Sequence, residues 1–92
     1  MKNQNIWYHG TSDHSWKQIQ KEGKLFGIQK NGKRFTFLCN SKDEASLYGD
    51  VVLRVEYDPL MDLFNNNFSP ETLEFGEMKV TSEIELSKVR RV

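Results

Sequence analysis

The sequence predicts an α+β fold class, a single small domain with a mostly antiparallel sheet and two short helices. Three observations lead to this prediction. Strand-like segments are spread over all 92 residues, both helix-like segments lie in the first half, and residues 51–92 are rich in strand patterns. Because a parallel pair needs a long crossover connection, usually a helix, the strands of the second half should pair antiparallel. Residues 1–92 are therefore expected to form one domain.

The first strand and the first helix have clear boundaries in the sequence. Residues 5–9, NIWYH, are apolar and aromatic and are followed by Gly10, which is typical of a short strand. A helix of about ten residues should begin near Asp13, with Ser12 or Asp13 as its N-cap. Gly23 is placed to end this helix in the left-handed conformation.

A connector, a strand and the second helix follow. Residues 24–33 contain two glycines and an Asn-Gly pair, and are expected to form a mobile connector. Residues 34–40 alternate as a strand does, with Phe35, Phe37 and Cys39 on one face and Thr36 and Leu38 on the other. Ser41 and Glu44 have the spacing of a capping box, which predicts a short helix that Gly49 ends. Its apolar side would be formed by Ala45, Leu47 and Tyr48.

The second half of the chain is dominated by strand patterns. Residues 51–57 alternate and should form a half-buried strand that stops at Asp58-Pro59. Residues 60–76 are polar with scattered aromatics, and an irregular segment is expected there. Two further strand candidates cover 77–81 and 84–92. The core residues expected in these last strands are Val80, Ile84, Leu86, Val89 and Val92.

The charge balance and the single cysteine limit the possible partners. Thirteen basic and thirteen acidic side chains cancel, so there is no strong DNA-binding signal. Cys39 has no second cysteine with which to form a disulfide, and no Cys/His spacing predicts a metal site. No apolar run reaches the roughly 18 to 20 residues of a membrane span, and the polar N-terminus lacks a signal-peptide core. We therefore expect a cytoplasmic chain without a membrane partner.

His9 is the first candidate for a functional residue. It closes a strand and is followed by Gly10, which allows a ligand or backbone to come close, and by the hydroxyl of Thr11 near a helix start. Free N–H groups at a helix start favour anions. A strand that bends into a helix in this way suits the ribose and phosphates of a nucleotide. The alternative is a histidine that only completes the strand end.

Several short motifs in a fixed order add to this interpretation. They are the sequence Tyr8-His9-Gly10-Thr11, the strand over 34–41, the pair Tyr48-Gly49, the strand over 51–58 and a late Glu77. Together they resemble the minimal ADP-ribosyltransferase-like fold, over residues 6–92. That family includes diphtheria-toxin-type toxins, poly(ADP-ribose) polymerases, small bacterial and phage transferases and RNA 2'-phosphotransferases. The resemblance implies a split sheet.

The resemblance also implies roles for individual residues. His9 would hydrogen-bond the adenosine ribose of NAD, and the backbone of Gly10 would contact the nicotinamide amide. Glu77, with Glu74 as the fallback, would stabilise the cation that forms on the ribose as nicotinamide leaves. Tyr48 would be the aromatic residue that stacks on nicotinamide, and it would form the catalytic set together with His9 and Glu77. The other residues to which the resemblance gives NAD contacts are Tyr8, Thr11, Phe37 and Ser41.

The function that this resemblance implies is that of an NAD-dependent mono-ADP-ribosyltransferase, or an NAD glycohydrolase, with NAD as the substrate. The acceptor would be an unidentified protein or RNA, and the setting would be a conflict between phage and bacterium. Phe75 stands where many members carry a Gln or Glu that helps to select the target. One alternative is a non-catalytic module that binds NAD, a related nucleotide or a protein. A second is an RNA 2'-phosphotransferase-like enzyme. The basic pair Lys33-Arg34 favours it, whereas Thr36 and Phe37 do not match the residues that such enzymes usually have at these positions.

Overall fold

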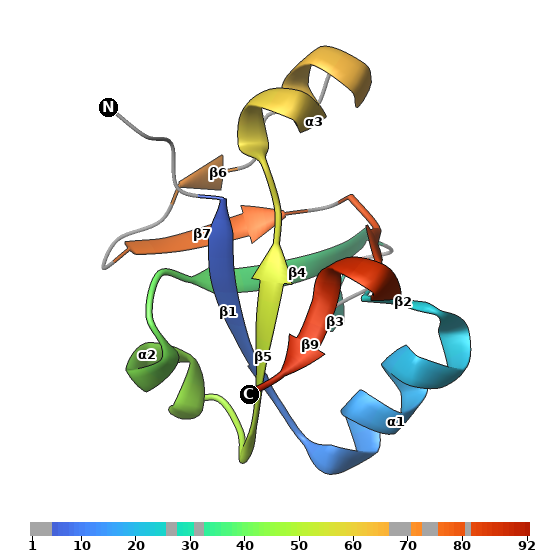
Figure 1. The fold of residues 1–92 in the computed structure, drawn as a ribbon, viewed down its shortest axis with the longest axis vertical. Coiled ribbons are helices and arrows are strands. Elements are labelled where there is room, and N and C mark those ends of the chain that lie inside the picture. Colours follow the sequence, from blue (N-terminus) through green and yellow to red (C-terminus); the bar gives the residue numbers. More distant parts are fainter. Residues whose placement is uncertain (1–4, 26–27, 31–32, 67–70, 73–75, 81) are drawn as a thin grey trace.

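The computed structural model describes residues 5–25, 28–30, 33–66, 71–72, 76–80 and 82–92. These residues form strands, three helices and one 3-10 turn, in an α+β arrangement (Figure 1). The helices are α1 (Asp13–Glu22), α2 (Lys42–Ser46) and α3 (Pro59–Asn66), and the 3-10 turn covers Leu86–Lys88. The strands are β1 (Ile6–Thr11), β2 (Lys24–Leu25), β3 (Ile28–Lys30), β4 (Lys33–Cys39), β5 (Val51–Glu56), β6 (Glu71–Thr72), β7 (Glu77–Val80), β8 (Ile84–Glu85) and β9 (Val89–Arg91).

The main sheet has the strand order β6-β7-β4-β1-β5-β9, and β3 also pairs with β4. Each strand pairing in the described part of the chain is antiparallel, as the sequence predicts. The centre of the sheet is its weakest connection. β1 pairs with β5 along its whole length, whereas it meets β4 at the single pair Tyr8↔Cys39. In Figure 1, β4 and β7 accordingly run across the direction of β1, β5 and β9.

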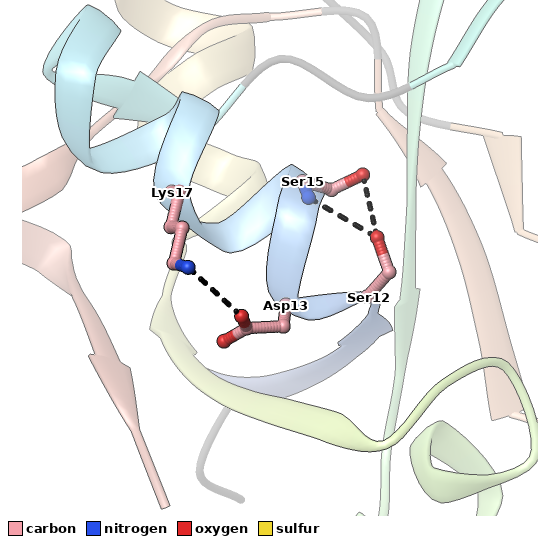
Figure 2. A network of polar contacts seen from close by, with 4 residues as sticks. All are labelled: Ser12, Asp13, Ser15 and Lys17. Atoms are coloured by element: carbon pink, nitrogen blue, oxygen red, sulfur yellow. Dashed lines mark hydrogen bonds and ion pairs between the residues drawn. The ribbon is translucent and has the colours of Figure 1, made fainter.

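Helix α1 forms where the sequence predicts it, because both of its ends carry the expected caps. The Oγ atom of Ser12 accepts a hydrogen bond from the backbone N–H of Ser15 at 3.1 Å (Figure 2). Asp13 and Lys17 add an exposed ion pair of 3.3 Å one turn apart. At the other end Gly23 has a φ of 76°, and its N–H donates to the carbonyl of Ile19. An N-cap of this kind contributes about 1 kcal/mol.

The core lies between this helix and one face of the sheet. It is built by the buried residues Ile19, Leu25, Leu38, Val51, Leu53, Val55, Tyr57, Met78, Val80, Ile84 and Val89. The alternation predicted for 51–57 is confirmed, since Val51, Leu53 and Val55 are buried. On β4 the face with Thr36 and Leu38 points to the core, while the rings of Phe35 and Phe37 are only half-buried.

Helix α3 corrects the prediction of an irregular segment over 60–76, and it is the third helix where two were predicted. Asp58 caps it, because one carboxylate oxygen accepts from the backbone N–H groups of Leu60 and Met61 at 3.0 and 3.4 Å. Pro59 stands at the first helical position, where its missing N–H costs nothing. The stop signal for the preceding strand is therefore also the start signal for a helix. Residues 67–70 and 73–75 lie outside the described residues.

Three smaller predictions are also wrong. The expected connector over 24–33 contains strands β2 and β3, and Leu25 of β2, which pairs with Ile84 of β8, is fully buried. The expected strand over 84–92 divides into β8 and β9, which join different sheets. Val92, expected in the core, is 48% exposed, and Leu47, expected on the apolar side of the second helix, is 82% exposed. Short apolar runs do not specify their partners, so sequence pattern alone cannot decide these cases.

Candidate functional site

Tyr48 and Glu77 meet in the structure, although 29 positions separate them in the sequence. Tyr48 follows α2, and Glu77 is the first residue of β7. The Tyr48 hydroxyl donates a hydrogen bond to Oε1 of Glu77 at the protein surface. This bond is the main cause that raises the pKa of Tyr48 to about 12. The phenol is therefore protonated at neutral pH and remains a donor to the carboxylate.

Two glycines hold Tyr48 in this position. A Cβ atom on Gly10 would lie only 1.8 Å from the carbonyl oxygen of Ala45 in α2. A Cβ atom on Gly49 would lie 2.2 Å from the carbonyl oxygen of Thr11, at the end of β1. Both positions need glycine because the backbones of α2 and β1 touch here. Gly10, whose backbone is expected to contact nicotinamide, thus allows α2 to pack directly against β1.

Strand register decides which side chains share a face with Glu77. Residues directly opposite each other on neighbouring strands point to the same side of a sheet. Tyr8 pairs with Cys39, and Cys39 pairs with Glu77, so the three share the face that α2 covers. Phe37 lies two residues before Cys39 on β4 and therefore points to this face as well. Tyr8 and Phe37, whose rings are half-buried, therefore lie on the same face of the sheet as Glu77.

His9 points to the other side of β1, since it pairs with the buried Leu53 of β5. Its Nδ1–H donates to the backbone carbonyl of Phe37 at 2.8 Å, which ties β1 to β4 beyond the pair of Tyr8 with Cys39. Burial lowers the pKa of His9 below its ordinary value of 6.5, so the ring is neutral at pH 7. A neutral imidazole that donates through Nδ1 presents Nε2 as an acceptor. A ligand that reached both His9 and Glu77 would have to lie across the junction of β1 and β4.

The remaining predicted site residues have local roles in the structure. Ser41 caps α2, because its Oγ accepts from the backbone N–H of Glu44 at 3.2 Å. Thr11 is the last residue of β1, pairs with Val51 and is half-buried. Glu74, the fallback for Glu77, and Phe75 lie outside the described residues. The structure thus brings Tyr8, Phe37, Tyr48 and Glu77 to one face, while His9 faces the core.

Two polar side chains beside Glu77, Cys39 and Glu44, are not among the site residues predicted from the sequence. The sulfur of Cys39 and one carboxylate oxygen each of Glu44 and Glu77 lie within 4.8 Å of one another. Burial, followed by the charges of Glu77 and Glu44, raises the pKa of Cys39 to about 11. The sequence did offer a signal for Glu44. It lies four positions before Tyr48, and residues four apart in a predicted helix share one face. No local pattern could have revealed the pairing of Cys39 with Glu77.

Comparisons with known proteins do not supply a relative for this chain. No protein-family model, no curated protein and no solved structure matched it. Within the described ranges, no helix combines the length and the apolar character needed to cross a membrane. The function must therefore be inferred from the site itself.

Proposed function

We propose that this protein is an NAD-dependent mono-ADP-ribosyltransferase or NAD glycohydrolase with Glu77 as its catalytic carboxylate and Tyr48 beside it. The observation that supports this proposal is the hydrogen bond between Tyr48 and Glu77. Two residues that the motif order selects independently, one after a helix and one on a late strand, come into direct contact.

The chemistry needs a fixed negative charge beside the ribose. When the glycosidic bond of NAD breaks, its electron pair leaves with nicotinamide, and positive charge develops on the ribose. Glu77 would stabilise that charge, and the Tyr48 hydroxyl would hold the carboxylate in one orientation before the reaction begins. Water or a nucleophile of the target then bonds to the ribose carbon and loses its proton. Water gives the glycohydrolase reaction, and a macromolecular nucleophile gives the transferase reaction.

The neighbouring residues can bind the two ends of NAD. The half-buried rings of Tyr8 and Phe37 share the face of Glu77 and offer flat surfaces for nicotinamide. The neutral ring of His9 offers Nε2 to a ribose hydroxyl. NAD that used both would lie across the junction where β1 and β4 share the single pair Tyr8↔Cys39.

The test measures nicotinamide release from NAD by liquid chromatography, with NAD labelled on its adenosine half to detect transfer to candidate proteins and RNA. Glu77→Gln should lower the rate by about 100-fold or more, as removal of one electrostatic contact to a transition state commonly does. Tyr48→Phe should lower it less. Glu56→Gln is the matched control, because Glu56 is an exposed strand carboxylate on β5. Neither nicotinamide release nor label transfer by the wild-type chain would refute the proposal.

One observation favours the non-catalytic alternative, a module that binds NAD or a related nucleotide. His9 points to the core side of β1, whereas Glu77 points to the face under α2. It is therefore harder for one ligand to contact both His9 and Glu77, as catalysis requires, than for a ligand to bind at one of these two residues. Calorimetry with NAD separates the two functions, because a binding module would retain NAD that is recovered unchanged. Weaker binding by His9→Ala would place the ligand at β1.

A further inference from the structure

Cys39, Glu44 and Glu77 come from three different elements and converge beneath Tyr48. Cys39 ends β4, Glu44 lies in α2 and Glu77 begins β7. Their sulfur and carboxylate oxygen atoms lie within 4.8 Å of one another. Three atoms so placed can share a centre no more than about 2.8 Å from each of them. Zinc is bound at about 2.3 Å from sulfur and 2.0 to 2.2 Å from carboxylate oxygen, so each ligand atom needs to move by less than 1 Å.

One oxygen of this cluster, Oε2 of Glu44, is buried without a hydrogen-bond partner among the described residues. The neighbouring Cys39 is a buried free cysteine, only 1% exposed. A buried carboxylate oxygen beside a second carboxylate is unfavourable unless a positive charge or a donor satisfies it. In the described residues no Lys or Arg forms an ion pair with Glu44 or Glu77.

We propose that Cys39, Glu44 and Glu77 bind a divalent cation of the zinc class. A thiolate and two carboxylates are a three-ligand set of the kind that leaves a fourth tetrahedral position open for water. A sulfur ligand and so few oxygen ligands do not suit magnesium or calcium, which take six or more oxygens. Tyr48 would be the outer partner, because its hydroxyl holds one oxygen of Glu77 and leaves the other free for the metal.

Binding displaces one proton, from the thiol of Cys39. The sulfur must become a thiolate to bind the cation. An ordinary thiol is protonated at neutral pH, so that proton leaves when the metal arrives. If the proposed function holds, the metal would also withdraw Glu77 from the ribose and inhibit the enzyme. That consequence rests on the proposed function, whereas the metal site does not.

The experiment uses the full chain, freed of metal by a chelator and kept reduced, and titrates it with Co²⁺ and with Zn²⁺. Co²⁺ should produce a thiolate-to-cobalt charge-transfer band that Zn²⁺ abolishes by displacement. Calorimetry in buffers of different ionisation enthalpy should find one Zn²⁺ bound and one proton released. Cys39→Ser should lose the band, and Glu44→Gln should weaken Zn²⁺ binding at least tenfold. Circular dichroism checks that each variant is folded.

Two controls make the result specific. Glu56→Gln removes an exposed carboxylate outside the cluster and should bind Zn²⁺ like the wild type. His14→Ala removes an exposed imidazole on α1 that could bind metal by itself, and it too should change nothing. The proposal is overturned if Co²⁺ gives no charge-transfer band, or if folded Glu44→Gln binds Zn²⁺ as tightly as the wild type. It is also overturned if His14→Ala rather than Glu44→Gln abolishes binding.

Discussion

Substitution of Gly10 by alanine should loosen the whole site, because it adds one carbon atom where two backbones touch. The new Cβ would lie 1.8 Å from the Ala45 carbonyl oxygen and 3.1 Å from the Cβ of Tyr48. Since real Cβ contacts essentially never fall under 3.0 Å, α2 must retreat by at least about 1.2 Å. Overpacking of this kind costs about 1 to 3 kcal/mol. The retreat carries Tyr48 away from Glu77 and breaks their hydrogen bond.

Two measurements follow the two effects of this substitution. Urea denaturation followed by circular dichroism gives the free energy of unfolding. Nuclear magnetic resonance of ring-labelled tyrosine gives the pKa of Tyr48, which Glu77 raises to about 12 and which should fall toward its ordinary value of 10.0 in Gly10→Ala. Because the folded pKa is the higher one, this bond stabilises the protein below pH 10 and is lost as the pH rises toward 12.

Gly23→Ala is the matched control for Gly10→Ala. Gly23 has a φ of 76°, so alanine there is strained by about 1 to 2 kcal/mol, but nothing lies within 4 Å of the added Cβ. This control should lose stability and keep the Tyr48 titration of the wild type. If Gly10→Ala unfolds with the wild-type free energy, or keeps the raised pKa of Tyr48, then α2 is not seated on Gly10 as described.

Two further predictions concern His9 and the anchor of α3. The folded pKa of His9 lies below the unfolded value of 6.5, so the unfolded chain binds its proton first and stability falls as the pH drops below 6.5. Urea midpoints at pH 7.5 and pH 5 should therefore differ less in His9→Gln than in the wild type, whereas an equal difference would contradict this. Asp62 is 7% exposed and accepts from the hydroxyls of Tyr57 at 2.5 Å and Ser82 at 2.8 Å. Asp62→Ala should cost about 2 to 3 kcal/mol by leaving the Tyr57 hydroxyl buried without this acceptor, and a change under about 0.5 kcal/mol would refute that role.

For the candidate site, the sequence proposed residues but could not predict how they are arranged. The motif order selected Tyr48 and Glu77, and these two residues meet. It also selected His9, which faces the opposite side of the sheet from Glu77. Alternation along a strand separates Tyr8 from His9, but only the pairing with β5 and β4 tells which of the two faces the core.

Errors in the fold prediction have a common physical cause. α3 exposes Leu60, Met61, Leu63 and Phe64 and buries Asp62, which is the reverse of the pattern by which amphipathic helices are recognised. The buried aspartate is satisfied by Tyr57 and by Ser82, a residue 20 positions later. Composition makes such a segment look polar and irregular. Only the partners of Asp62 explain why a helix lies there with this face turned inward.

The sequence by itself determined the features that depend on near neighbours. These are the capped helix α1, the cap of α2 by Ser41 and the alternation of β5, because caps and strand faces are set within a few residues. Tertiary structure decided what depends on strand register and close packing. The pairing of Cys39 with Glu77 brought a thiol and two carboxylates together, and Gly10 seated α2 so that Tyr48 reached Glu77. Contacts between residues 29 or more positions apart leave no local pattern, so no reading of neighbouring residues could find them.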